Sequence, residues 1–510
     1  MDLLAANSRP AHLDPTRWFK QRLAALALLV TIADFLFYQA PAGGLPLALF
    51  LVLLFVAAAT FNRLRSSGNW RLVAAALLFA AIAALMADAD PLSVPLAVAL
   101  STASVVLLVH GAVGWLAVTR MTVLLPLTGW LRLAGDFVRI RRATIRRGRL
   151  HFDISGWIVP VGLSLFFLVV FLVANPVLDH WAGMLSPDHL MLADGRHIIF
   201  WGAMALIVWP VLHLVRRRHA AAIPSLLPIA NGAWSIVFGD GAVRRSLVAF
   251  NLLFALQTLT DLGYLWGGMD LPKGMTHAEY AHRGAYPLMA AAMMAAAFVL
   301  IALRNDQHER RPRALTPFLA VFVGQGLGLV ISSMLRLDLY VEAYSLTLWR
   351  VAAFVWMGLV AFGFGTILIR ILFGQSTPWL VNVNAGAVLL ALWACCFVDF
   401  AGLVTGFNVA HSRQATGQGP DLDFNYIART FGARAIPALD ARRDLLAGRG
   451  TGLVIPIDGG WVNPSLDDWR DQTAAQMLAT DENWRTWIFA DWQLRRYLSE
   501  APRWATPEPR

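Results

Sequence analysis

Long apolar stretches separated by short polar loops dominate the pattern of this sequence. A helix needs about 20 predominantly apolar residues to cross the roughly 30 Å hydrocarbon core of a bilayer. Eleven stretches approach this length: 23–40, 45–61, 70–87, 94–119, 157–175, 198–215, 247–266, 284–303, 315–335, 351–372 and 379–404. They predict an all-α integral membrane protein with about eleven transmembrane helices.

The composition agrees with a protein dissolved mainly in lipid. Apolar residues make up 58% of the 510 residues and charged residues 15%, against roughly 45–50% and 25% in soluble proteins. The two cysteines, Cys395 and Cys396, are adjacent within an apolar stretch. Neighbours in a helix cannot form an unstrained disulfide, so we expect both to be small packing residues.

Basic residues in the loops predict the orientation of the chain. Cytoplasmic loops carry an excess of Lys and Arg. With residues 1–22 in the cytoplasm, the inside segments contain 25 Lys and Arg and the outside loops 5. Eleven spans then place the C-terminus outside the cytoplasm. Three regions result: a cytoplasmic N-terminus over 1–22, a transmembrane bundle over 23–404, and an extracytoplasmic helical domain over 405–510.

The C-terminal region is long enough, at 106 residues, to form a small domain. Ser465 and Thr480 can each cap a following helix, and the last of these helices is rich in Trp. We expect the region to pack on the outer side of the bundle, near the loops 267–283 and 336–350. A protein of the cell envelope is a possible partner for it.

The net charge of +10 raises the question of nucleic-acid binding. The densest basic cluster runs from Arg139 to Arg149 inside the cytoplasmic loop 120–153, beside apolar residues at helical spacing. This combination indicates contact with anionic lipid headgroups. No aromatic or glycine-rich nucleic-acid module accompanies it, so we expect the lipid bilayer, and no nucleic acid, as the partner.

Five stretches of the chain together resemble one known family: residues 252–268, 274–288, 332–360, 379–400 and 422–440. The combination is similar to the bacterial multi-pass membrane family called domain of unknown function 4173, which is related to the 4153 type. The resemblance is densest from about 245 to 440. It implies a bacterial inner (cytoplasmic) membrane protein and carries over no catalytic residue.

Ionisable groups within lipid are costly and are therefore functional candidates. Asp34, His110, His213 and Asp399 are such groups, but Asp261 has the richest polar surroundings, because Asn251 and Gln257 precede it at near-helical spacing. The trio can form a structural hydrogen-bond network between helices or part of a substrate or proton pathway. Asp261 needs compensation for its charge, and we expect it to meet either an arginine or a water-filled pocket open to the outside. The candidate arginines are Arg283, Arg336 and, as the easiest to bring inward, Arg350.

Two outside loops contain a similar set of polar residues, which could together line an outer vestibule. Arginines there would suit a carboxylate or phosphate group. The candidates are His277, Glu279, Tyr280, His282, Arg283, Arg336, Asp338, Tyr340, Glu342, Tyr344 and Arg350. His277 and His282 are five residues apart rather than four, so we expect no metal site. Acid–base catalysis by Glu279 with a histidine stays an alternative.

Glycines at 324 and 328 form a GxxxG motif, which favours close helix packing. No nucleotide-binding loop, zinc-protease motif or nucleophile elbow is present, so no cofactor is expected. The many spans and Asp261 favour a transporter or permease. A non-transporting sensor, scaffold or envelope-assembly factor acting through 405–510 is the alternative, and a membrane-embedded transferase or hydrolase is the second.

Overall fold

The fold was analysed in a computed structural model. It describes residues 15–38, 43–64, 66–111, 115–127, 135–136, 195–214, 240–266, 277–304, 315–446, 455–457, 460–462, 464–480 and 483–501. The predicted span 157–175 and the basic cluster Arg139–Arg149 lie outside these residues. The chain divides into two units: Met1–Ala220 with Glu482–Ala490, and Ala221–Asp481 with Asp491–Arg510.

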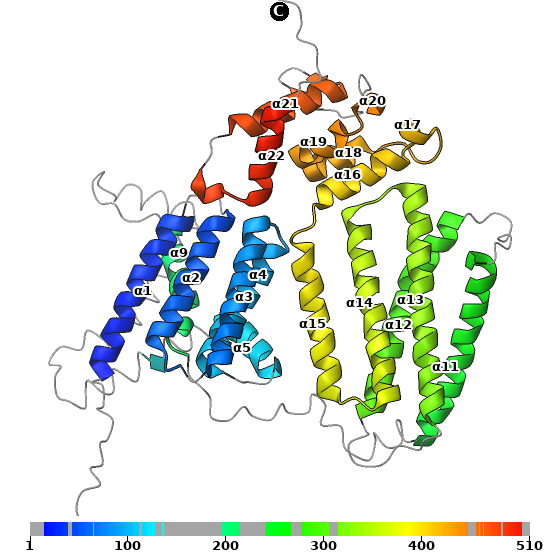
Figure 1. The fold of residues 1–510 in the computed structure, drawn as a ribbon, viewed down its shortest axis with the longest axis horizontal. Helices are drawn as coiled ribbons and strands as arrows, with labels where there is room; N and C mark the ends of the chain where they lie inside the picture. The colour runs from blue at the N-terminus through cyan, green and yellow to red at the C-terminus, as the bar shows by residue number, and fades with distance from the viewer. Residues whose placement is uncertain are drawn as a thin grey trace, which may run out of the picture. The chain divides into compact units, whose positions relative to one another are not determined.

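The first unit consists of apolar helices (blue to green in Figure 1) and one short segment from late in the chain. The helices are α1 (Pro15–Phe37), α2 (Gly44–Phe61), α3 (Gly68–Ala87), α4 (Ser93–His110), α5 (Trp115–Leu127) and α9 (Gly195–Leu212). Asp34 near the end of α1 contacts His197 near the start of α9, whereas Phe19 contacts Trp209 with ring centroids 5.6 Å apart. These two helices are therefore antiparallel.

The fourth predicted span, 94–119, is wrong as one continuous helix. The helix α4 ends at His110, and Gly111 follows with φ of 71° before α5 begins at Trp115. A positive φ is accessible to glycine because it has no Cβ, which makes glycine the common residue just beyond a helix end. Gly111 thus divides an apolar stretch that hydropathy alone joins.

The second unit contains a helical bundle, built from α11 (Asp240–Asp261) with the π-helical turn η1 (Leu262–Trp266), α12 (His277–Arg304), α13 (Thr316–Tyr344), α14 (Leu348–Phe373) and α15 (Thr377–Cys395). Asn251 of α11 bonds Phe318 of α13, and further along both helices Phe254 packs on Phe322 at 5.0 Å. These two helices therefore run parallel, as the first and third of three consecutive antiparallel crossings must.

Close packing between α13 and α14 occurs at Gly326. A Cβ at Gly326 would lie 2.5 Å from the ring of Phe364, whereas one at Gly324 or Gly328 would meet no described atom within 4 Å. Among the described residues, the close packing thus occurs at Gly326 and not at the two glycines of the GxxxG motif. Gly326, midway between those two glycines, leaves room for the ring of Phe364, which is 1% exposed.

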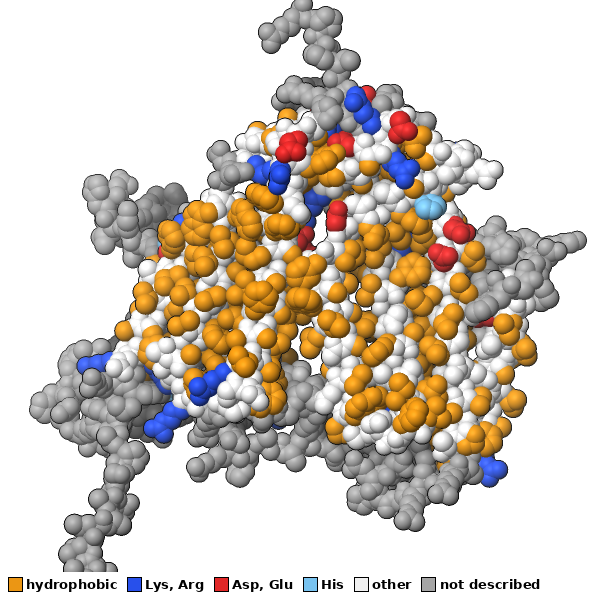
Figure 2. Space-filling model, viewed as in Figure 1, with side chains coloured by type: hydrophobic (Ala, Val, Ile, Leu, Met, Phe, Trp, Pro, Cys, Tyr) orange, Lys and Arg blue, Asp and Glu red, His pale blue; other side chains and the backbone are white. Residues whose placement is uncertain are grey.

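Many side chains on the helix middles are large, apolar and exposed. Leu72 and Phe79 on α3 are 71% and 72% exposed, and Leu252 on α11 is 68% exposed. Orange side chains cover the helical part of each unit in Figure 2. Water would disfavour so much exposed apolar surface, so these helices have the surface of a protein embedded in lipid.

Seven helices in the described residues are long and apolar enough to cross a membrane: Gly44–Phe61, Gly68–Ala87, Ser93–His110, Val243–Tyr264, Thr316–Tyr344, Leu348–Phe373 and Thr377–Cys395. Two further predicted spans coincide with the shorter apolar helices Arg196–Leu212 and Pro287–Leu300. The first predicted span, 23–40, overlaps α1, which ends at Phe37 and is not among the seven. The prediction of a multi-pass helical protein is confirmed, and the number eleven stays a prediction.

The C-terminal residues of the second unit fold around a hydrophobic core of their own, which includes Ile427, Ile436 and Leu439. Their elements are α16 (Phe400–His411), α17 (Arg413–Thr416), α18 (Phe424–Phe431), η4 (Gly432–Ala435), α19 (Ile436–Asp440), α20 (Arg443–Leu446), β1 (Ile455–Ile457), β2 (Gly460–Val462), α21 (Leu466–Ala479) and α22 (Phe489–Glu500). The antiparallel pair of β1 and β2 is the only strand pairing in the described residues. We call this part the tail.

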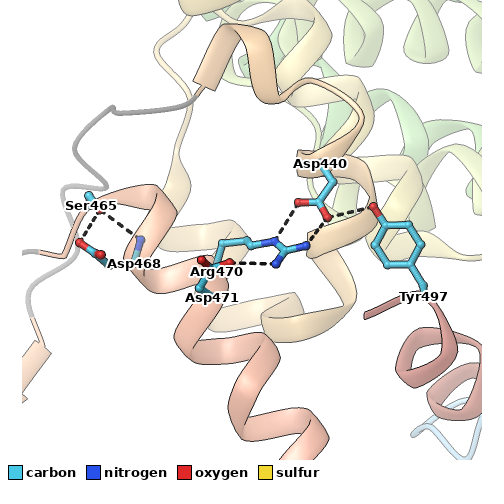
Figure 3. A network of polar contacts seen from close by, with 6 residues as sticks. All are labelled: Asp440, Ser465, Asp468, Arg470, Asp471 and Tyr497. Atoms are coloured by element: carbon cyan, nitrogen blue, oxygen red, sulfur yellow. Dashed lines mark hydrogen bonds and ion pairs between the residues drawn. The ribbon is translucent and has the colours of Figure 1, made fainter. Parts of the chain in front are cut away.

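A buried arginine joins three parts of the tail (Figure 3). Arg470 of α21 donates to both carboxylate oxygens of Asp440 at 3.0 and 2.6 Å and to Asp471 at 2.9 Å. Burial lowers the pKa of Arg470, but the two carboxylates outweigh it and the net shift is upward. Tyr497 of α22 donates its hydroxyl to Asp440 at 2.9 Å. Burial, together with this bond and the negative charge of Asp440, raises the pKa of Tyr497 to about 12, although the charge of Arg470 acts in the opposite direction.

This network predicts a pH dependence for the tail. Because the pKa of Tyr497 is raised in the folded protein, its stabilising contribution is complete below the unfolded pKa of roughly 10. It is lost as the pH rises through about 12. Titration curves of tyrosinate absorbance at 295 nm are recorded for the full chain and for Tyr497→Phe. The difference between the two curves should correspond to one tyrosine that ionises with a pKa of about 12. A difference that titrates near the ordinary pKa would contradict the network.

Candidate functional site

Asp261 is the last residue of α11 and lies inside the bundle of the second unit. Its side chain is 1% exposed and forms an ion pair with Arg336 of α13, whose side chain is 2% exposed. The π-helical turn η1 begins directly after Asp261. Such turns often occur at functional sites, because they displace a side chain from its regular helical position. Two opposite charges thus meet on neighbouring helices within an apolar bundle.

The structure joins one of the two predicted amides to Asp261. Gln257 donates to Asp261 Oδ1 at 2.9 Å, one helical turn earlier on the same helix. Asn251 instead donates to the carbonyls of Leu247 at 2.8 Å and Phe318 at 3.2 Å. Asn251 therefore connects α11 to α13 at another level, and among the described residues the polar site contains Asp261, Gln257 and Arg336.

The expectation that Arg350 would be the easiest partner for Asp261 is wrong. Arg350 lies in the first turn of α14 and donates to the carbonyls of Tyr344, at 2.6 Å, and Ser345. Its guanidinium also lies 4.5 Å from the ring centre of Tyr340. The turn between α13 and α14 supplies acceptors close to Arg350. Arg336, by contrast, already lies on the buried face of α13 and reaches Asp261 directly.

Of the vestibule candidates on α13 other than Arg336, none that the structure describes has a contact with Asp261. Asp338 and Glu342 are exposed, and Tyr340 packs on Tyr344 with centroids 4.8 Å apart. The other five candidates begin α12, but their side chains lie outside the described part of the structure: His277, Glu279, Tyr280, His282 and Arg283. Among the described residues, no group of three or more His, Cys, Asp and Glu side chains could hold a metal.

Sequence reasoning missed two polar clusters on α9 in the first unit. His197 contacts Asp34 of α1, stacks on Tyr38 at 3.7 Å, and shares the carboxylate with Trp201. Asp34 and, in the second cluster, His213 were candidates, but their partners were unknown. The signal available in the sequence was a histidine and a tryptophan four residues apart.

The second cluster lies at the opposite end of α9. His213 Nδ1 lies 2.5 Å from Asp136, and Trp209 donates to the same carboxylate at 3.2 Å. Asp136 is 3% exposed. Each end of α9 therefore carries a histidine and a tryptophan, four residues apart, that share one carboxylate from another segment.

The apolar exposed helices and the buried ion pair define a class: this is a polytopic helical membrane protein. Within that class, the model of the family described as "Domain of unknown function (DUF4153)" matches residues 72–441. That range covers most of the chain, so the protein belongs to the DUF4153 family. It contains both Asp261 and Arg336. No curated protein and no solved structure matches the chain.

The family match refines the resemblance drawn from sequence. The related 4153 type is shown, whereas membership of the 4173 family is not. The match also begins at residue 72, well before the region from about 245 to 440 where the resemblance is densest. Helices of the first unit are therefore part of the family domain, although hydropathy was their only visible signal.

The buried pair predicts a strongly non-additive mutant series. Arg336→Met removes the ion pair of Asp261 within the bundle and should cost about 3–5 kcal/mol of stability. The double variant with Asp261→Leu should recover most of this loss, because it removes both members of the buried pair. Thermal unfolding of the detergent-solubilised full chain measures both.

The matched control is the exposed pair Arg413–Asp421, with side chains 58% and 67% exposed and 3.4 Å apart. Arg413→Met should cost about 0–1 kcal/mol, since solvent screens surface pairs. Equal losses for Arg336→Met and Arg413→Met would show that Asp261 does not depend on Arg336.

Proposed function

We propose that this protein is a permease-like membrane protein whose substrate pathway passes the Asp261–Arg336 pair between α11 and α13. The observation that supports this proposal is the near-complete burial of both charges within an apolar bundle. Replacing such pairs by apolar residues is often neutral or stabilising, so a buried pair is weak support for a purely structural role. Charged residues at this depth commonly mark the pathways of ions and substrates.

The chemistry of the pair suits a gate. Asp261 and Arg336 cancel each other's charge, and Gln257 adds one neutral donor at 2.9 Å. A charged solute or a proton that binds one partner frees the other to interact elsewhere. In the closed state the two charges neutralise each other, and in the open state the bound solute neutralises one of them. Neither state then leaves an isolated charge in the low-dielectric bundle, where such a charge is costly.

We further propose that the protein lies in a bacterial inner membrane with eleven spans, the N-terminus in the cytoplasm and the C-terminus outside. The excess of basic residues in alternate loops, 25 against 5, supports this orientation. The antiparallel pair α1 and α9 and the parallel pair α11 and α13 have the relative directions that this alternation demands.

Fusion proteins test the orientation. Alkaline phosphatase attached after Arg510 should be active, because the enzyme folds only outside the cytoplasm. A green fluorescent protein at the same position should stay dark. The opposite pattern would overturn the parity of spans, the orientation, or both.

The alternative function is a non-transporting sensor, scaffold or envelope-assembly factor that acts through the tail. Asn408 of α16 holds the backbone of Leu346 from both sides, accepting from its N–H at 2.6 Å and donating to its C=O at 2.8 Å. Tyr426 accepts from Leu348 N–H at 2.9 Å. The tail is thus hydrogen-bonded to the turn that follows α13. A partner that binds the tail would therefore be connected through these bonds to α13, the helix that contains Arg336.

Electrical recording from proteoliposomes distinguishes the two functions. The purified full chain, on a solid-supported membrane, is exposed in turn to amino acids, organic acids, sugars and inorganic anions. A permease should give a transient current with at least one class of solute. The conservative variants Asp261→Glu and Arg336→Lys should reduce that current at least about tenfold, because the geometry of the pair changes although its charges remain.

Arg413→Gln, in the exposed pair, is the matched control and should leave the current unchanged. A current that persists in both pair variants would remove the pair from the pathway. No current with any solute class, from protein that is folded by circular dichroism, would refute the permease proposal and favour action through the tail.

A further inference from the structure

The segment 483–490 belongs to the first unit, although α21 and most of α22 on either side belong to the second. Its backbone packs directly on the start of α2. A Cβ at Gly43 would lie 2.2 Å from the carbonyl oxygen of Arg485 and 2.6 Å from the Cα of Thr486. Ile488, 7% exposed, is buried beside Gly44. The segment is therefore fixed on the helices, and glycine is required where it touches them.

The aromatic side chains of this segment remain open. Trp484, Trp487 and Phe489 are 45%, 36% and 43% exposed. Trp484 packs on Phe35 of α1, with ring centroids 6.2 Å apart, and Phe35 is itself 59% exposed. Phe35 lies two residues before the end of α1 at Phe37. Trp484 therefore lies at the level where an apolar helix surface ends, which is where Trp and Tyr gather in membrane proteins.

Arg485 gives this aromatic surface a positive charge. Its guanidinium lies 4.4 Å from the ring centre of Phe35 and 5.7 Å from that of Trp484. Among the described residues no carboxylate pairs with it. Arg496 of α22 provides a contrast, because it also lies near a tryptophan but pairs with Glu500 at 3.7 Å. Arg485 thus presents a forked donor beside an aromatic surface, with no carboxylate partner in the part of the chain that the structure describes.

We infer that Arg485, with Phe35 and Trp484, forms a binding site for the phosphate of an anionic phospholipid, at the membrane interface by the C-terminal end of α1. The guanidinium matches two phosphate oxygens at once. The indole and phenyl rings contact the glycerol region and the first methylenes of the acyl chains. Packing at Gly43 holds the segment in place, so binding requires little ordering of the protein.

Lipid binding by the full chain tests this site. Native mass spectrometry of the detergent-solubilised protein, titrated with phosphatidylglycerol or phosphatidylcholine, should show preference for the anionic lipid. Arg485→Gln should weaken phosphatidylglycerol binding about five-fold, the effect expected for one basic residue near an anionic surface. Arg485→Lys should lose less, since it keeps the charge and loses only the fork. Arg496→Gln, whose charge Glu500 already compensates, should bind as the unmodified chain does.

A spin label shows whether the segment is at the interface. It is placed by Trp487→Cys in a chain carrying Cys395→Ala and Cys396→Ala, reconstituted in nanodiscs with phosphatidylglycerol. Collisions with dissolved oxygen should exceed those with a water-soluble nickel complex, and the Arg485→Gln background should leave this ratio unchanged. Loss of lipid preference would then be due to the guanidinium and not to displacement of the segment.

Three results would overturn the site. The first is equal phosphatidylglycerol binding by the unmodified chain and Arg485→Gln. The second is displacement of the lipid by millimolar inorganic phosphate, which would indicate a site for free phosphate. The third is a label at position 487 that collides mainly with the nickel complex, because the segment would then lie in water.

Discussion

A charge inside a bilayer must be neutralised within the protein, and this constraint governs how the second unit is built. Asp261 would be costly against lipid, by a few kcal/mol on insertion scales. Its ion pair with Arg336 removes that cost only if α11 and α13 stay parallel and in register. The contact of Asn251 with Phe318 and the packing of Phe254 on Phe322 hold that register. These two contacts between α11 and α13 therefore keep Asp261 opposite Arg336.

The same constraint explains where irregular structure occurs. The π-helical turn η1 follows Asp261, and Ser345 adopts a positive φ of 66° at the turn after α13. Both lie near the ends of helices, where backbone groups can find other partners. Arg350 donates to the carbonyls of Tyr344 and Ser345, and Asn408 satisfies both backbone groups of Leu346. Polar side chains thus complete the backbone hydrogen bonds that the helices leave open.

Hydropathy predicted the helical class and the approximate position of most spans, because length and apolarity are local properties of the chain. It could not predict that Gly111 ends α4, since that depends on one backbone angle. It also could not choose among three arginines for Asp261. Arg350 is nearer the predicted start of a span, but Arg336 lies on the packed face of α13. That choice depends on helix rotation and on local acceptors, and neither is visible in composition or spacing.

Capping shows the same division between local and distant information. Ser465 caps α21 as predicted, accepting from Asp468 N–H, because the signal and the helix are adjacent. Thr480 does not cap the last helix, which begins only at Phe489. Residues 483–488 lie between Thr480 and Phe489. They pack against Gly43 and Gly44, more than 400 positions earlier in the sequence. Helix propensity is weak compared with such packing. The chain therefore leaves the helical pattern at 483–488, where two glycines of the same unit allow its backbone to pack closely.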